Sequence, residues 1–177
     1  MTAFIQKIYR YDHLISSRLC DFRSRESLTC VMIIASRIGD GPAWALLGLG
    51  LLIFGGATGA SAALVLTIAS IICIVIFKLV KSATSRKRPF EEFPDLPMDS
   101  RTPPPDRFSF PSGHSMNAFA VAVVYGYYFP SMLVPLMALA ALIAASRVFL
   151  SLHYPSDVTV GAVVGVTVAS LVIMIAG

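Results

Sequence analysis

The sequence predicts an all-α fold, an integral membrane helical bundle with about five transmembrane helices and an N-terminal amphipathic interfacial helix. Of its 177 residues, 56% are hydrophobic and 14% are charged, whereas about 25% of the residues in a soluble domain are charged. Charged residues and histidine are missing from three stretches of 37, 32 and 20 residues, at 41–77, 115–146 and 158–177. A chain of this length suits one domain, so we expect residues 1–177 to form a single membrane-embedded domain.

The neutral stretches can be divided into membrane spans, each of which needs about 20 apolar residues. Glycines within residues 55–59 divide the first stretch, and Phe129-Pro130-Ser131 divides the second. The predicted spans are 42–55, 60–80, 114–129, 132–151 and 156–176. This path places the two termini at opposite faces of the membrane, and it brings the charged side chains to the N-terminal face.

Residues 1–24 are predicted to form the amphipathic helix. Apolar side chains recur there at steps of three and four, at Phe4, Ile8, Tyr11, Ile15, Leu19 and Phe22. Such a helix would lie in the membrane interface or pack on the other helices. Charges at Lys7, Arg10, Asp12 and Arg18 interrupt any apolar signal-peptide core. Residues 27–37 are apolar but too few to cross, so we assign 1–40 to interfacial helices and 41–177 to a transmembrane catalytic core.

Residues 89–111 connect the second and third spans and differ sharply in composition. Seven of the eleven prolines, five acidic residues and two arginines fall within these 23 residues. Loops of this length are usually either functional or disordered. Because the segment links two of the motifs described next, we expect either a stiff cap over a site or a solvated connector.

A basic segment follows the second span and contains Lys81 and Arg88-Pro89. A helical separation of seven residues would place Lys81 and Arg88 two turns apart on one face, where both could contact an anion. Basic residues beside a span also commonly set topology or touch anionic headgroups. Arg86 and Lys87 are assigned to that lesser role.

The second motif, Pro111-Ser112-Gly113-His114, comes directly before an apolar helix. Ser112 suits the N-cap position, and Gly113 allows close backbone approach. The free N–H groups and the helix dipole would then favour a phosphate at this point. The alternative is a capped helix start with an incidental histidine.

The third motif contains Ser146-Arg147, His153 and Asp157. Arg147 follows an apolar run, where a charged side chain is costly unless it is paired. Pro155 suits the first position of the last helix, which would place Asp157 in the first turn. Asp157 could then accept a hydrogen bond from His153 and leave the other ring nitrogen free for attack.

Together, Lys-x6-Arg-Pro, Pro-Ser-Gly-His and Ser-Arg-x5-His-x3-Asp resemble the signature of the type 2 phosphatidic acid phosphatase superfamily. The resemblance covers Lys81 to Asp157 and implies a small bacterial membrane lipid phosphatase. It implies that His153 attacks phosphorus to form a phosphohistidine and that Asp157 orients His153. It implies that His114 protonates the leaving oxygen and later activates water. The implied phosphate-binding residues are Lys81, Arg88, Ser112, Gly113 and Arg147.

No cofactor is expected. A zinc or magnesium site would normally combine more carboxylates or thiolates, and the acidic residues of 89–111 lack a ligand-like pattern. The cations would neutralise the phosphate instead, so we expect no metal site and metal-independent hydrolysis. The expected partners are a lipid phosphate and the bilayer, with no nucleic acid. The sequence does not indicate an oligomeric state.

The leading hypothesis is hydrolysis of the phosphate or pyrophosphate of a lipid, such as a polyprenyl pyrophosphate, phosphatidylglycerol phosphate, phosphatidic acid or lipid A. The alternatives are a lipid-to-lipid phosphotransferase and a non-catalytic lipid-phosphate binder or transporter. The bacterial members of the family imply a multi-pass protein of the inner membrane, with its site at the periplasmic face. The count of Lys and Arg favours the cytoplasmic face, but the site itself requires cations.

Overall fold

The computed structural model describes residues 3–176, apart from the side chain of Phe4. Met1, Thr2 and Gly177 of the predicted domain, and the contribution of Phe4 to the apolar series, lie outside this description. Between residues 3 and 176 the secondary structure is helical, without strands, which confirms the predicted all-α fold. The helices are α1 (Ala3–Cys20), η1 (Asp21–Ser24), α2 (Glu26–Ile38), α3 (Gly41–Phe54), α4 (Gly56–Thr84), α5 (Pro89–Glu92), α6 (Gly113–Tyr128), η2 (Pro130–Met132), α7 (Leu133–Phe149) and α8 (Pro155–Ala176).

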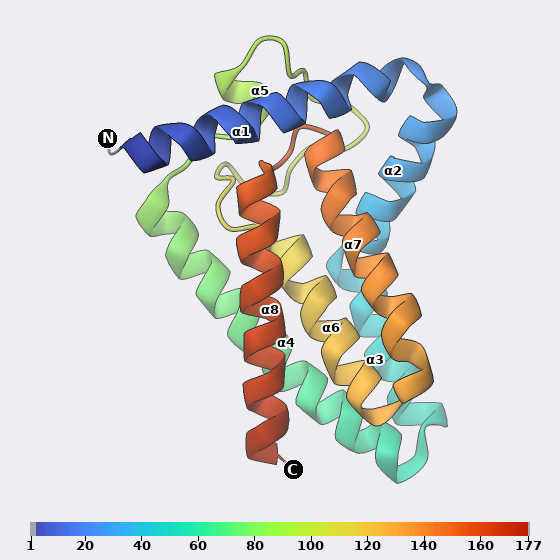
Figure 1. Ribbon diagram of the computed structural model, residues 1–177. Coiled ribbons are helices and arrows are strands. Elements are labelled where there is room, and N and C mark those ends of the chain that lie inside the picture. The colour runs from blue at the N-terminus through green and yellow to red at the C-terminus, as the bar shows by residue number, and fades with distance from the viewer. Residues whose placement is uncertain (1–2, 177) are drawn as a thin grey trace.

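Helix α6 lies at the centre of the bundle and packs against α4, α7 and α8. Helix α1 crosses one end of the bundle, and the chain ends at the other (Figure 1). The short helix α5 and the connector that leads to α6 lie at the same end as α1 (Figure 1). This end therefore gathers the charged segments, as the neutral stretches predict.

Three helical segments are long and apolar enough to cross a membrane: Gly56–Glu92, Pro130–Phe149 and Pro155–Ala176. A fourth candidate is the pair α2 and α3, which is bent by 57° at its break. The helix expected at 27–37, on the surface or half-buried, is α2, which forms the first half of this bent pair and packs along α7. Helix α6 has 16 residues, fewer than the about 20 that span a bilayer.

Helix α1 turns its polar side toward the bundle. Asp12 and Ser16 are 3% and 1% exposed, whereas Tyr11 and Ile15 are 53% and 43% exposed. The helix contacts α7 and α8. The segment was predicted either to lie in the membrane interface or to pack on the other helices. Helix α1 has features of both, because it packs on other helices while its apolar side faces outward, as in an interfacial helix.

Two glycines set the contact between α6 and α8. A Cβ atom added at Gly165 would lie 2.1 Å from the carbonyl oxygen of Met116, and one at Gly161 would lie 2.6 Å from that of Ser112. Small residues four apart allow this close approach of two helix backbones. The Ser112 N–H donates to the Asp157 carbonyl oxygen at 3.1 Å, so the packing brings the second and third motifs together.

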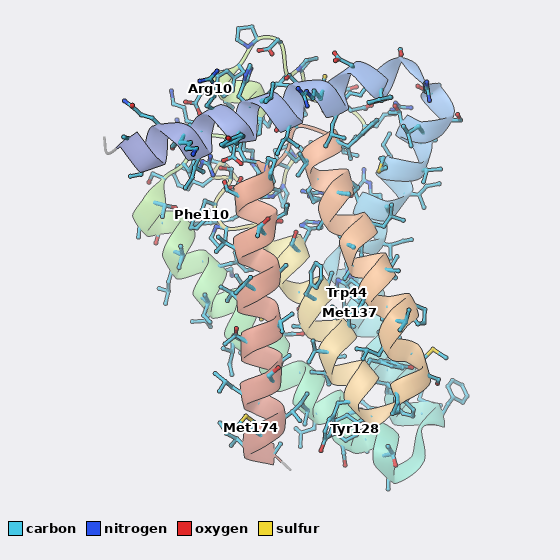
Figure 2. The ribbon with its side chains drawn as sticks, viewed as in Figure 1. Arg10, Trp44, Phe110, Tyr128, Met137 and Met174 are labelled. Atoms are coloured by element: carbon cyan, nitrogen blue, oxygen red, sulfur yellow. The ribbon has the colours of Figure 1, made fainter. Side chains whose placement is uncertain are left out.

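Apolar side chains fill the rest of the bundle. Trp44 and Met137, labelled in the middle of Figure 2, both pack against a buried cluster of α6 and α7 that includes Ala118 and Ile143. The indole N–H of Trp44 donates to the carbonyl oxygen of Gly39 at 3.1 Å. This bond holds the start of α3 against the break that follows α2.

Candidate active site

A cavity of about 220 Å³ is lined by residues from all three motifs. Its lining includes Lys81, Arg88, Gly113, His114, Arg147 and His153, together with Pro105 and Asp106 of the connector. Ser112 and Asp157 are fully buried behind this lining. The structure therefore brings six of the eight predicted site residues to one cavity and places the other two as supports.

Lys81 and Arg88 meet in the cavity by a different route from the one predicted. Helix α4 ends at Thr84, and Ser85 adopts the left-handed conformation with φ +48°. The chain is extended at Arg88, which is the N-cap residue of α5. The expectation that one helical face carries both residues is wrong, because the turn at Ser85 and not helical periodicity directs them to the same place.

Asp106 of the connector bridges these two cations. Its carboxylate accepts hydrogen bonds from Lys81 Nζ at 2.7 Å and from Arg88 at 2.8 Å. Burial alone would raise the pKa of Asp106, but the bond from Lys81 and the charge of Arg88 hold it below its usual value. The connector thus contacts the cations directly, which favours the cap over a solvated connector.

Arg147 is 3% exposed near the end of α7. Its guanidinium donates to the hydroxyl of Ser36 on α2. The Arg147 Nε group has no hydrogen-bond partner among the described residues, although it is buried. A buried, incompletely paired guanidinium on a cavity wall is suited to an anionic ligand.

The second motif forms the start of α6 as predicted. Ser112 is the N-cap residue, and its hydroxyl accepts from the Ser115 N–H at 3.4 Å. Gly113 and His114 begin the helix and face the cavity. His114 Nε2 lies 2.9 Å from a carboxylate oxygen of Asp40, at the break between α2 and α3. Sequence reasoning missed Asp40, since nothing in the sequence links it to a motif 74 residues away.

His153 lies between α7 and α8 and is 1% exposed. Burial, and after it the nearby cations led by Arg88, lower the pKa of the imidazole well below its usual value. The ring is therefore neutral near pH 7, which is the form that can act as a nucleophile. Its Nε2 atom lies 3.4 Å from Arg88 on the cavity side.

Asp157 stands in the first turn of α8, which begins at Pro155 as predicted. One carboxylate oxygen accepts the Tyr154 N–H at 2.8 Å and lies 3.7 Å from His153 Nδ1. This distance is longer than a hydrogen bond, and Nδ1 has no partner among the described residues. The expected pair is therefore in contact, but its hydrogen bond is not formed in this conformation.

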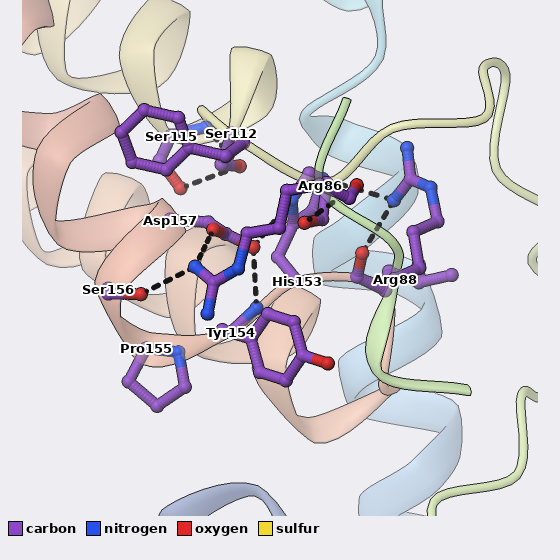
Figure 3. A network of polar contacts seen from close by, with 12 residues as sticks. Arg86, Arg88, Ser112, Ser115, His153, Tyr154, Pro155, Ser156 and Asp157 are labelled. Atoms are coloured by element: carbon purple, nitrogen blue, oxygen red, sulfur yellow. Dashed lines mark hydrogen bonds and ion pairs between the residues drawn. The ribbon is translucent and has the colours of Figure 1, made fainter. Parts of the chain in front are cut away.

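The other Asp157 oxygen accepts from Arg86 at 2.6 Å, and Figure 3 shows this pair beside Ser156 and Tyr154. The assignment of Arg86 to topology or headgroup contact is therefore wrong. Its side chain is 11% exposed and forms ion pairs with both Asp157 and Asp12. Two acidic partners far apart in the sequence draw this arginine inward, away from the headgroups.

Three cations and two imidazoles line the cavity, beside apolar side chains such as Trp44 and Phe77. Among residues 3–176, no group of three or more His, Cys, Asp and Glu side chains is arranged to hold a metal ion. Lys81, Arg88 and Arg147 instead provide positive charge beside the start of α6. Such a set of donors suits the oxygens of a phosphoryl group.

The fold and the cavity define a class, a helical membrane protein with two histidines and three cations around one anion-sized site. The chain belongs to the PAP2 superfamily, whose family model matches residues 58–176. The matched range contains all three motifs, so the resemblance predicted from them is confirmed.

Decaprenylphosphoryl-5-phosphoribose phosphatase from Mycobacterium tuberculosis is 38% identical over 103 residues, which cover 56% of this chain and 52% of that protein. Lipid A 1-phosphatase from Rhizobium etli is 37% identical over 94 residues, or 51% of this chain and 40% of that protein. The chain thus spans about half the length, or less, of these curated relatives.

Two solved structures have a similar fold. A transmembrane PAP2 type phosphatidylglycerolphosphate phosphatase from Bacillus subtilis superposes with a TM-score of 0.77 and 25% identity, over 98% of this chain and 87% of that chain. LpxE from Aquifex aeolicus has a TM-score of 0.75 and 22% identity, over 93% of this chain and 95% of that chain. The second similarity is one of fold alone.

Proposed function

We propose that this protein is a membrane phosphatase, with residues 1–177 as one catalytic domain, that hydrolyses the phosphate or pyrophosphate group of a lipid. The observation that carries the proposal is the shared cavity, in which His114 and His153 face the same three cations. A binding site alone would need the cations but not two imidazoles, one of them buried and neutral.

The first step is attack by His153 on phosphorus. His153 Nε2 forms a bond to phosphorus, the bond to the lipid oxygen breaks, and His114 gives its proton to that oxygen. Lys81, Arg88 and Arg147 stabilise the charge on the transferring oxygens, with the N–H groups at the start of α6. Asp106 is bonded to Lys81 and Arg88 in the free protein, so it must give up these bonds when a phosphate binds.

The second step hydrolyses the phosphohistidine. His114, now neutral, accepts a proton from water, and the water oxygen attacks phosphorus as the bond to His153 breaks. Phosphate leaves, and both histidines return to their starting forms. Asp157 stabilises the charge on the His153 ring, because it lies 3.7 Å from Nδ1.

A lipid substrate is supported by a second, apolar cavity of about 400 Å³ between α3 and α4. It shares Gly41, Trp44, Ile74 and Asn117 with the lining of the candidate active site. The rest of its wall is largely aliphatic, with Leu49 and Leu52 on one helix and Leu66 and Ile71 on the other. A hydrocarbon tail can follow this groove from the phosphate to the bilayer, and the named relatives also act on lipid-linked groups.

The test is phosphate release by the purified protein from polyprenyl pyrophosphate, phosphatidylglycerol phosphate, phosphatidic acid and lipid A. We expect at least one lipid to release free phosphate, and we expect the rate to stay within about twofold when a chelator removes divalent cations. Cations of the protein take the charge-neutralising role that a metal has in other phosphoryl transfers.

Three other outcomes would contradict parts of this proposal. Transfer of the phosphate to a second lipid, without free phosphate, would make the protein a phosphotransferase. Binding without turnover on every lipid would make it a binder or transporter. Loss of activity with chelator, restored by one added divalent cation, would refute metal independence alone.

We further propose that the protein lies in the inner membrane with its active site at the periplasmic face. Cysteines introduced at Ser131 and Asp99 test this in a variant whose Cys20, Cys30 and Cys73 are replaced by serine. In intact cells an impermeant maleimide should label Asp99→Cys, which is at the site end, and reach Ser131→Cys only after permeabilisation. The opposite pattern would place the site in the cytoplasm.

A further inference from the structure

The polar side of α1 contacts the first turn of α8, which contains Asp157, the residue beside the candidate nucleophile His153. Asp12 is 3% exposed although α1 lies across the outer end of the bundle. Its carboxylate accepts the N–H of Ser156 at 2.9 Å and the Ser156 hydroxyl at 2.5 Å. Asp12 therefore holds the first turn of α8, one residue before Asp157.

Arg86 connects Asp12 to Asp157. Its guanidinium lies 2.8 Å from an Asp12 oxygen and 2.6 Å from an Asp157 oxygen. The same group stacks over the rings of Tyr154, at 4.1 Å, and Tyr9, at 4.7 Å. Two aromatic rings and two carboxylates therefore fix the position of Arg86.

The contacts form a continuous chain from α1 to the cavity, which runs Asp12, Arg86, Asp157, His153. Within it, one guanidinium is shared by two buried carboxylates. Without Asp12, the full charge of Arg86 would act on Asp157 alone and would compete with the His153 ring for that carboxylate. The guanidinium would also lose one of its two carboxylate partners.

We infer that Asp12 is a positioning residue for the reaction, which acts through Arg86 on Asp157 and makes α1 a working part of the active site. The inference rests on the proposed function. Asp12 does not line the cavity and does not touch Lys81, Arg88 or Arg147. Its effect should therefore fall on the chemical step and not on phosphate binding.

The test compares Asp12→Asn with wild type for kcat on the preferred lipid and for competitive inhibition by inorganic phosphate. Asparagine keeps the size and an acceptor oxygen for Ser156 but removes the charge that faces Arg86. We expect kcat to fall by about 10–100-fold, as it does for partners that orient metal-ligating side chains in other proteins, while the phosphate inhibition constant changes by less than about twofold.

Arg86→Lys tests the same link from the other side, since one ammonium group cannot span both carboxylates in the manner of a guanidinium. It should show the same selective loss of kcat. In the double variant, Asp12→Asn should then cost less than about threefold more, because residues that act through one another are not additive. If Asp12→Asn does not fold, Arg86→Lys still decides whether the link affects kcat separately from phosphate binding.

Asp21→Asn is the matched control, since Asp21 is an exposed carboxylate on η1, directly after α1. It should keep kcat within about twofold of wild type. Wild-type kcat in folded Asp12→Asn would overturn the inference, as would a parallel loss of kcat and phosphate affinity. Full additivity in the double variant would also overturn it. If wild type itself releases no phosphate from any lipid, the proposed function fails, which is a distinct result.

Discussion

Replacing His153 by alanine is expected to lower lipid phosphate turnover by about 10³-fold or more, because removal of a nucleophile typically costs several orders of magnitude. The neutral, buried ring lies between α7 and α8 and faces the cavity beside Arg88. Phosphate release is the measurement. A second measurement is covalent label on the protein after rapid quenching with ³²P-labelled substrate, which should appear in wild type and be absent in His153→Ala.

The chain offers a matched control in His13, which lies on α1 and contacts Asp95 at 3.0 Å, away from the cavity. His13→Ala should keep both turnover and the covalent label within about twofold of wild type. Near-normal turnover in folded His153→Ala would exclude a phosphohistidine at this position. Turnover lost while a label persists would place the nucleophile on another residue.

The helices could be predicted from the sequence because the membrane imposes a simple rule. Uncharged stretches bounded by glycine or proline predicted α3, α4, α6, α7 and α8, with ends close to those observed. The run from 27 to 37 was predicted as a separate surface or half-buried helix because it is too short to cross on its own, and α2 has nearly these bounds. The sequence did not indicate that α2 and α3, which are separated by a break at Gly39 and Asp40, together have the length and apolar character of one bent span.

The site could be predicted only where a residue belongs to a motif. The motif cations and histidines meet in one cavity, although Lys81 and Arg88 reach it through the turn at Ser85 and not along a helix. Motif spacing predicts the approximate position of each side chain, because it reflects where each helix begins or ends. It does not predict the backbone conformation between those positions.

The pairing of Arg86 with buried carboxylates could not be predicted from the sequence. Asp12 and Arg86 are 74 residues apart, and Arg86 stands among other basic residues beside a span. That local pattern is the same for an arginine that touches headgroups and for one that is buried between two carboxylates. Only the three-dimensional packing of α1 on α8 separates the two cases.

Replacing His114 by alanine distinguishes the proposed phosphatase from a non-catalytic lipid-phosphate binder. If His114 protonates the leaving oxygen, its loss should lower kcat on an alkyl ester by about 10²–10⁴-fold, the usual contribution of a general acid. An aryl ester such as 4-nitrophenyl phosphate has a leaving group that needs no proton, so formation of the phosphohistidine should suffer much less. Hydrolysis of the phosphohistidine should still be slow, since His114 also activates water.

The expected signature of His114→Ala is therefore a rapid release of about one equivalent of 4-nitrophenol, followed by slow turnover, with the ³²P label accumulating on His153. Asp40, whose carboxylate lies 2.9 Å from His114 Nε2 in the wild-type protein, is left unchanged in this variant. Equal losses on alkyl and aryl esters would remove the acid role from His114. Unchanged function on every ester would favour the binder or transporter, since such a protein has no use for this proton.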